Sequence, residues 1–239
     1  MKGLIVAIQF LTRLPTPRLS VSGAEFAASM RWFPAVGLIL GALVAGGCWL
    51  GAAIDPWTGT LAGLVLWVAV TGALHLDGLG DIADAAGAAH KDRDRVLSVL
   101  SDPHIGSFGA VAIGVQLIAK LVLLHALVAT GAWLAIALVP FAARIAPLFW
   151  TRWLPDFHAG LASRFRDAVR PIDLSIWSVT LLAACWFSPS LLAAPLLWFG
   201  WAAWLWRKLG GISGDGHGAG IELTESGLLL AALLLVRFA

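Results

Sequence analysis

The chain has 239 residues, of which 59% are hydrophobic and only 13% are charged, roughly half the charged share of ordinary soluble domains. This composition excludes a typical water-soluble fold. A net charge of +2 without a long basic run argues against nucleic acid as a partner. The length leaves room for several membrane-spanning helices of about 20 residues each but for no second domain. We therefore predict one all-α integral membrane domain over residues 1–239.

Apolar runs bounded by charged residues, Pro or Gly predict the membrane spans in chain order. A short apolar segment, residues 1–12, comes first and either lies along the membrane or enters it. Pro189 divides the longest apolar region into two spans, and the final apolar segment is short for a crossing. The predicted runs are 33–53, 59–76, 108–129, 132–150, 174–206 and 227–238. The result is a polytopic helix bundle with about six or seven transmembrane helices.

The connections between these runs alternate in charge. Lys and Arg residues gather before the first span and after the second, fourth and sixth, whereas the connections near 54–58, 130–131 and 188–190 contain neither. By the positive-inside rule, the charged connections face the cytoplasm. Asp55 is the only acid outside these charged connections and the N-terminal arm. The other carboxylates are therefore available to one cytoplasmic site.

Small residues indicate how the spans pack, and aromatic residues indicate where they end. Gly37 and Gly41 have the G-x-x-x-G spacing that is typical of close helix packing. Trp residues at the ends of apolar runs are expected to be anchors at the membrane interface. These are Trp32, Trp57, Trp133, Trp150 and Trp153.

An acidic stripe follows the second span. Asp77, Asp81 and Asp84 are spaced at i, i+4 and i+7, so a continuing helix places them on one face. Three like charges repel one another, and Mg²⁺, which prefers hard oxygen ligands, would neutralise them. The alternative is a solvated acidic helix end. Because acids are scarce in this chain and the stripe adjoins the bilayer, we favour a metal site.

A second acidic segment, residues 210–225, follows the sixth span. Six glycines fall within residues 210–220, which we expect to form a loop. Glycines let a backbone approach a ligand and point N–H groups at phosphate oxygens. Asp215 lies among them, and we interpret it as a functional residue. Glu222 and Glu225 then begin the final apolar helix, where capping of the helix N-terminus is an equal alternative.

Polar residues inside or next to the third and fourth spans complete the candidate site. The turn containing Asp102 and Ser107 leads into a helix N-terminus that could bind an anion. Lys120 lies halfway along the third span, where an ionisable residue usually faces a protein interior or a ligand path. Arg144 is either a phosphate clamp or an interfacial anchor. Carboxylates, glycines and cations on one side together indicate phosphoryl-group transfer at the membrane surface.

Several motifs resemble the cobalamin synthase family, the adenosylcobinamide-GDP ribazoletransferases of the bacterial inner membrane, and the resemblance runs nearly from end to end. The matching motifs are Phe10–Pro17, Phe33–Gly37, His75–Asp84, Ile105–Gly109, Lys120, Ala143–Arg144 and Gly210–Asp215. The sequence departs from the family pattern at Ala85, at Pro103-His104 and at Ser213, where the family usually has Gly, Ser-Arg and Thr. His104 is therefore left out of the predicted site.

The resemblance implies that α-ribazole, or its 5′-phosphate, is transferred onto adenosylcobinamide-GDP with release of GMP, giving adenosylcobalamin or its 5′-phosphate. It also implies a requirement for Mg²⁺ and a multi-pass enzyme of the inner membrane whose site faces the cytoplasm. A homo-oligomer is possible, and so is an association with other enzymes of corrinoid assembly.

The same resemblance assigns roles to residues. Metal ligands are expected at Asp77, Asp81, Asp84 and Asp215, and one of the first three would be the base toward the attacking hydroxyl. The catalytic residues would be Asp77, Asp81, Lys120 and Arg144, the two cations offsetting charge on the diphosphate. Substrate contacts are expected from His75, Asp102, Ser107, Gly211, Ser213, Gly214 and Glu222.

Two other protein classes share parts of this pattern. A phosphatidyl-type transferase also uses spaced Asp residues, but its motif requires Gly and then Ala-Arg after the second Asp, whereas Ala85-Ala86-Gly87 follows Asp84. A transporter with Lys120 in its path would be expected to carry an internal repeat and mid-membrane polar groups in several spans. The sequence has no such repeat, and only the third span carries such a group.

Overall fold

The computed structural model describes residues 2–88, 93–157 and 161–238, and the regular elements in these ranges are helical, which confirms the all-α class. The long helices are α3 (Phe33–Ala52), α4 (Pro56–Thr71), α5 (Leu74–Ala88), α7 (Ser107–Ala129), α8 (Trp133–Trp153), α10 (Pro171–Cys185), α11 (Ala194–Lys208) and α12 (Gly214–Phe238). The short ones are α1 (Lys2–Leu11), α2 (Gly23–Ala28), η1 (Ser29–Trp32), α6 (Arg93–Leu100), α9 (Leu161–Ala168) and η2 (Pro189–Ala193). Lys91, one of the cations used to orient the chain, lies outside the described residues.

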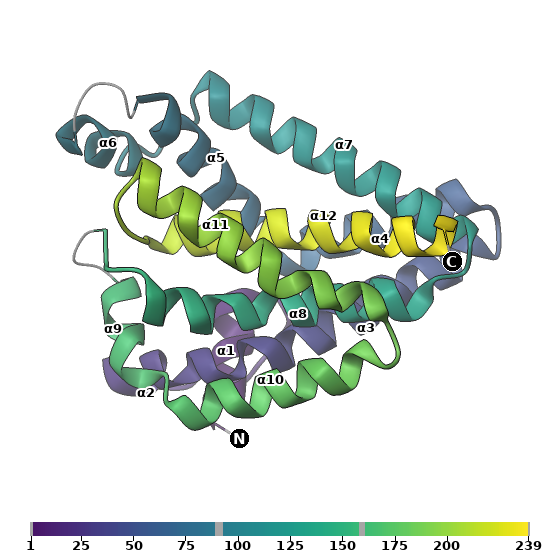
Figure 1. The fold of residues 1–239 in the computed structure, drawn as a ribbon, viewed down its shortest axis with the longest axis horizontal. Helices are drawn as coiled ribbons and strands as arrows, with labels where there is room; N and C mark the ends of the chain where they lie inside the picture. The colour runs from purple at the N-terminus through teal and green to yellow at the C-terminus, as the bar shows by residue number, and fades with distance from the viewer. Residues whose placement is uncertain (1, 89–92, 158–160, 239) are drawn as a thin grey trace.

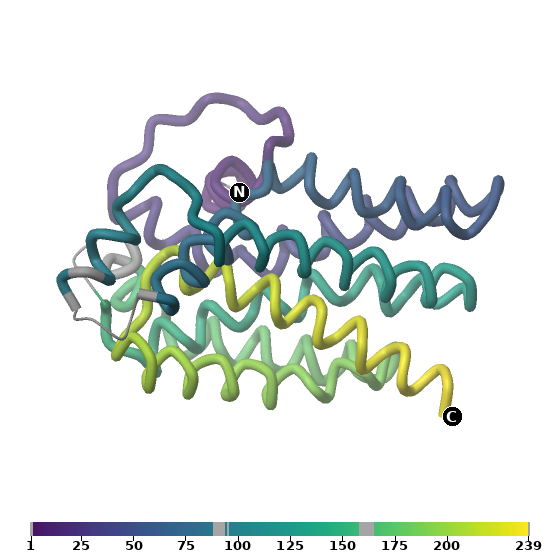
Figure 2. The backbone as a smooth tube through the Cα atoms, turned by 90° about the horizontal axis from the view of Figure 1, so that it is seen from above, coloured from purple at the N-terminus to yellow at the C-terminus, as the bar shows by residue number. Residues whose placement is uncertain are grey.

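Apart from α5, the long helices run side by side as one bundle (Figure 1). The α3–α4 and α7–α8 turns, η2 and the end of α12 lie at one end of the bundle. The other end carries α5, α6, α9 and the connection from α11 to α12, and thus both acidic segments. Figure 2 shows α1 nearly end-on while the long helices cross the picture, so α1 lies across the bundle axis. This orientation fits a helix that lies along a membrane surface.

Fewer helices than predicted are long enough to cross a membrane alone. Among the residues that the structure describes, four helices qualify: residues 23–52, α7, α8 and α12. A fifth is counted if α4 and α5, which meet at an angle of 82°, form one broken span. The region 174–206 does divide at Pro189, as predicted. However, α10 and α11 have only 15 residues each, which corresponds to about 22 Å, less than a hydrocarbon core of about 30 Å.

Helices α3 and α8 pack closely against each other in the interior. A Cβ atom built on Gly37 would lie 2.5 Å from the carbonyl oxygen of Pro140, and one on Gly41 would lie 1.8 Å from that of Ala137. Only glycine permits backbones to approach this closely. The prediction that these glycines serve helix packing is confirmed.

The Trp residues predicted to be interface anchors differ in exposure, and Trp32 and Trp133 are half-buried. Trp57 and Trp153 are about half exposed near the ends of their helices, as expected of interface anchors. Trp150 is fully buried, and its Nε1 donates a hydrogen bond of 2.9 Å to the carbonyl oxygen of Trp198. The interpretation of Trp150 as an anchor was wrong, because a residue near the end of an apolar run can still face the protein interior.

Candidate active site

The first acidic stripe lies on a helix of its own. The predicted span 59–76 ends early, because α4 stops at Thr71 and Gly72 adopts the left-handed conformation with φ 60° and ψ 30°. The N–H groups of Gly72 and Ala73 cap α4 by donating to the carbonyls of Ala69 and Val68, the pattern of a Schellman motif. Ala73 also has a positive φ of 59°, which is unusual for a residue with a side chain. This turn directs α5 across the end of the bundle.

The second acidic segment is helical. The glycine-rich residues 214–220, predicted to be part of a loop, form the first turns of α12. Ser213 caps this helix by accepting a hydrogen bond of 3.0 Å from the N–H of Gly216. Glu222 and Glu225 therefore lie well inside the helix, so the interpretation that they begin and cap it was wrong.

The structure brings the two acidic segments together, because α5 crosses α12 at glycines. A Cβ atom on Gly78 would lie 2.9 Å from the carbonyl oxygen of Asp215 and 3.0 Å from its Cα. One turn further along, Gly218 faces the backbone of His75, and its Cβ would lie 3.3 Å from that Cα atom. The backbone of Asp215 thus lies directly against the helix that carries Asp77 and Asp81.

The carboxylates gather around Asp81. It is subject to the negative charges of Asp215, Asp77 and Asp84, in decreasing order of effect, and like charges this close oppose one another. Carboxylate oxygens suit Mg²⁺, which is commonly held by one or two carboxylates, water and substrate phosphate. Among the residues that the structure describes, no group of three or more His, Cys, Asp or Glu side chains is placed to hold a metal ion.

Asp84, unlike the other three aspartates, is described by its hydrogen bonds to the start of α7. Its Oδ2 accepts a hydrogen bond of 2.7 Å from the N–H of Gly106, and its Oδ1 accepts one of 3.0 Å from the N–H of Gly109. Asp84 therefore occupies the N-terminus of α7, the position that the sequence suggested for a bound anion. Of the expected substrate residues nearby, Asp102 and Ser107 are exposed, and Asp102 accepts a 3.0 Å hydrogen bond from the N–H of His104.

A cavity of about 220 Å³ opens beside the acids. One part of its wall is polar and contains His75, Asp77, Asp215 and His217. The remaining wall is apolar and includes aromatic rings from three separate segments, Phe10, Phe33 and Phe165. Phe33 stacks on Phe10 with ring centroids 5.9 Å apart and meets Phe165 edge-on at 6.1 Å. Sequence reasoning missed this aromatic wall, because its members are far apart in the chain.

Lys120 and Arg144 do not lie open to this cavity. Lys120 Nζ lies 2.7 Å from Glu222 Oε2 and 2.5 Å from Glu225 Oε2. Arg144 Nη1 lies 2.7 Å from Glu225 Oε1. All four side chains are buried, and two positive charges balance two negative ones. Glu222, predicted as a substrate contact, belongs to this interior network.

The interior network reaches the cavity through one residue. The second guanidinium nitrogen of Arg144, Nη2, is 3.3 Å from Nδ1 of His75, which also lines the cavity. On the far side, Gln116 Nε2 donates to Oε2 of Glu222 at 2.9 Å. The spacing of Gln116 and Lys120 on one helix face, with Glu222 and Glu225 at i, i+3 on another, was the available sequence signal for this pairing.

The segment before α12 is held by the end of α8. The N–H of Ile212 donates to the carbonyl of Pro155 at 2.9 Å, and the N–H of Phe157 donates back to the carbonyl of Ile212 at 2.9 Å. Gly211 fits this contact because a Cβ there would lie 2.7 Å from the carbonyl oxygen of Pro155. Gly211 and Ser213 are therefore buried in backbone contacts, whereas Gly214 is exposed and lines the cavity.

Comparison with known proteins gives a consistent result. A family model described as cobalamin-5-phosphate synthase matches residues 3–233. A protein of Novosphingobium aromaticivorans named adenosylcobinamide-GDP ribazoletransferase is 62% identical over 98% of this chain and 97% of its own length. Proteins with the same name from Laribacter hongkongensis and Thiobacillus denitrificans are 53% and 47% identical, covering 99% and 97% of this chain and 98% and 95% of their own lengths. No solved structure matches the chain.

Proposed function

The chain belongs to the cobalamin-5-phosphate synthase family, and from this membership we propose that it transfers α-ribazole, or its 5′-phosphate, onto adenosylcobinamide-GDP. A ribose hydroxyl of the ribazole attacks the cobinamide-linked phosphorus, a new P–O bond forms, and the P–O bond to GMP breaks. The hydroxyl proton passes to a base, and GMP leaves. The observation that supports this reaction best is the cavity with an acidic wall next to an aromatic wall.

The acidic wall is where we propose the diphosphate to bind. Asp77 and Asp215 line this wall and, with Asp81 nearby, offer carboxylate oxygens. One or two carboxylates, together with water and the diphosphate itself, make up a donor set that Mg²⁺ commonly takes. When bound, the ion would offset the negative charge of the diphosphate and of the leaving GMP. Asp84 is left out of this proposed set because both of its oxygens already accept backbone hydrogen bonds. Asp77 is exposed and lines the cavity, which suits a base toward the ribose hydroxyl.

The aromatic wall is where we propose the ribazole to bind. Its base is flat and apolar, and stacking on aromatic rings is favourable beyond simple area burial. A cavity of about 220 Å³ has room for such a base but not for a corrin ring. The corrinoid part of the other substrate would therefore remain outside, with only its diphosphate reaching the acids.

Lys120 and Arg144 contribute indirectly in this proposal. Their charges are balanced by Glu222 and Glu225, so they are not available to the diphosphate. Arg144 instead orients His75, whose ring lines the cavity. The expectation that only the third span carries a mid-membrane polar group was wrong, because Arg144 lies in α8 and Glu222 and Glu225 lie in α12. These charges pair with one another and with Lys120, so no transport path is needed to explain them.

The proposed location is the inner membrane, with the acidic end of the bundle in the cytoplasm. That end carries most of the Lys and Arg residues outside the spans, while the opposite turns at 53–55, 130–132 and 186–188 contain none. This asymmetry is what the positive-inside rule requires.

The test is GMP release by the purified chain in liposomes supplied with adenosylcobinamide-GDP, α-ribazole and Mg²⁺. We expect Asp77→Asn to lower turnover at least about a hundredfold, as loss of a positioned base does. Asp94→Asn, an exposed acid on α6, is the matched control and should retain wild-type turnover. Chelation of divalent cations should stop the reaction. Wild-type turnover by Asp77→Asn, or full activity after chelation, would contradict the assignment.

A further inference from the structure

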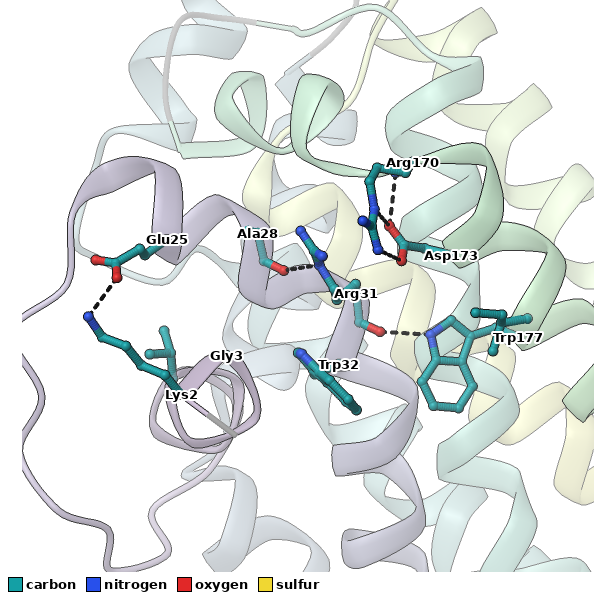
Figure 3. A pocket seen from close by; sticks show the side chains of 11 residues that line it. Lys2, Gly3, Glu25, Ala28, Arg31, Trp32, Arg170, Asp173 and Trp177 are labelled. Carbon is teal, nitrogen blue, oxygen red and sulfur yellow. Dashed lines mark hydrogen bonds and ion pairs between the residues drawn. The ribbon is translucent and has the colours of Figure 1, made fainter.

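A second and larger cavity lies on the outer face of the bundle. It has a volume of about 500 Å³ and is bounded by α1, the α2–η1 segment and the start of α10 (Figure 3). It shares no lining residue with the cavity beside the acids. The proposed transfer reaction therefore leaves it without a role.

The charges around this outer cavity do not cancel. Lys2 pairs with Glu25 at 2.6 Å, and Arg170 pairs with Asp173 at 2.9 Å. Arg31 is a third cation that lies between these pairs in Figure 3. Its Nε donates to the carbonyl oxygen of Ala28 at 2.8 Å. Its charge acts on Asp173, but that acid pairs directly with Arg170, and within the described part of the chain no acid lies within ion-pair distance of Arg31. The cavity therefore carries one positive charge in excess.

The Lys2–Glu25 pair can give way to a ligand more readily than a buried pair. Both side chains are about half exposed, and ion pairs in contact with solvent contribute little to stability. A phosphate group held by Arg31 would thus gain Lys2 as a second cation, because breaking the Lys2–Glu25 pair costs little free energy. The planar guanidinium of Arg31 suits two oxygens of one phosphate.

The rest of the wall has the character of a membrane interface. Trp32 and Trp177 line the cavity, and Trp177 Nε1 donates to the carbonyl oxygen of Arg31 at 2.7 Å. Indole rings favour the level of the lipid headgroups. Ile176 continues from the cavity wall onto an exposed apolar face of α10, with Ile172 and Val179 beside it. Because α1 crosses the bundle axis (Figure 2), the cavity opens where headgroups would meet hydrocarbon.

We propose that this outer cavity binds an anionic phospholipid, whose headgroup phosphate contacts Arg31 and whose acyl chains lie along the apolar face of α10. Basic pockets at the cytoplasmic end of membrane helices are suited to such lipids. A soluble phosphate compound would share the contact with Arg31 but would leave the apolar face of α10 unused. A bound lipid would connect α1, η1 and α10, segments far apart in the chain.

The test titrates phosphatidylglycerol into the purified chain in zwitterionic detergent and counts bound lipids by native mass spectrometry. We expect phosphatidylglycerol to bind at least about tenfold more tightly than phosphatidylcholine, since loss of a charge-assisted contact has about this effect. Arg31→Gln should remove this preference. Arg18→Gln, an exposed arginine outside the cavity, should retain it. Should Arg31→Gln not fold, Arg31→Lys is expected to show an intermediate preference.

Three results would overturn the proposal. The first is equal binding of phosphatidylglycerol and phosphatidylcholine by the wild type. The second is an equal loss of the preference for phosphatidylglycerol in Arg31→Gln and Arg18→Gln. The third is displacement of the lipid by glycerol 3-phosphate at a concentration comparable to that of the lipid, which would show that the acyl chains add nothing to the affinity. Since none of these measurements uses turnover, their outcome is independent of the proposed transfer reaction.

Discussion

Replacing Glu225 with Gln should destabilise the protein strongly, because this carboxylate neutralises two buried cations. Its oxygens lie 2.5 Å from Lys120 Nζ and 2.7 Å from Arg144 Nη1. After the substitution, Glu222 alone faces two positive charges in the bundle interior. Removing one partner of a buried pair costs about 3–5 kcal/mol. We expect a loss of this size in the free energy of unfolding, measured by denaturation in bicelles.

A compensating change tests whether charge is the cause. Lys120→Met combined with Glu225→Gln leaves one cation and one anion, and this double variant should be more stable than Glu225→Gln alone. The coupling energy from the double-mutant cycle then measures the interaction directly. Simple additivity of the two changes, or wild-type stability of Glu225→Gln, would refute the argument that the ion pairs hold α12 against α7 and α8.

Three further outcomes are expected. Gly78→Ala places a Cβ 2.9 Å from the Asp215 carbonyl oxygen, so α5 and α12 must separate and turnover should fall about tenfold or more. Gly46→Ala, which meets nothing within 4 Å, should leave turnover intact, and equal effects would contradict the crossing contact. Asp84→Asn should cost about 1 kcal/mol of unfolding free energy through the weakened α7 N-terminus; no change would mean that the contact is not stabilising. The Asp55 carboxylate caps α4, and the hydrogen bonds from Thr58 lower the pKa of this carboxyl. Its contribution to the free energy of unfolding is therefore fully present at a pH above the ordinary pKa of an aspartate, and it is lost as the pH falls through the lowered pKa. Asp55→Ala should abolish this part of the acid dependence of thermal unfolding, and an unchanged pH profile would argue against the cap.

The sequence was sufficient for the features that depend on local pattern. Apolar runs gave the positions of α3, α7 and α8 to within a few residues, and the spacing of Gly37 and Gly41 indicated a close helix contact. The acidic segments around Asp77 and Asp215 could be expected to meet, because both follow spans that end on the charged side of the membrane.

The features that the sequence did not predict depend on tertiary contacts. Glycine disfavours a helix by roughly 1 kcal/mol per residue, so residues 214–220 were expected to form a loop. In the bundle Gly216, Gly218 and Gly220 lie against neighbouring residues, whereas Gly214 is exposed. A Cβ on Gly220 would lie 2.4 Å from the Trp201 ring, and helical hydrogen bonds satisfy the backbone inside a membrane. The positive φ of Ala73 carries no local signal either. The spacing of Glu222 and Glu225 indicates a shared helix face but does not identify Lys120 as their partner.

The interior ion pairs impose an order on how the chain is built into the membrane. Lys120 lies in α7 and Arg144 in α8, while both of their carboxylate partners lie in α12, 81 residues or more further along the chain. During synthesis, two helices with uncompensated positive charges therefore enter the membrane before their counter-charges exist. Each such charge at mid-membrane costs about 2.5–3.5 kcal/mol during insertion. Insertion of α12 removes this penalty and in the same step delivers Asp215 to the helix that carries Asp77, so the site is completed only when the interior becomes neutral.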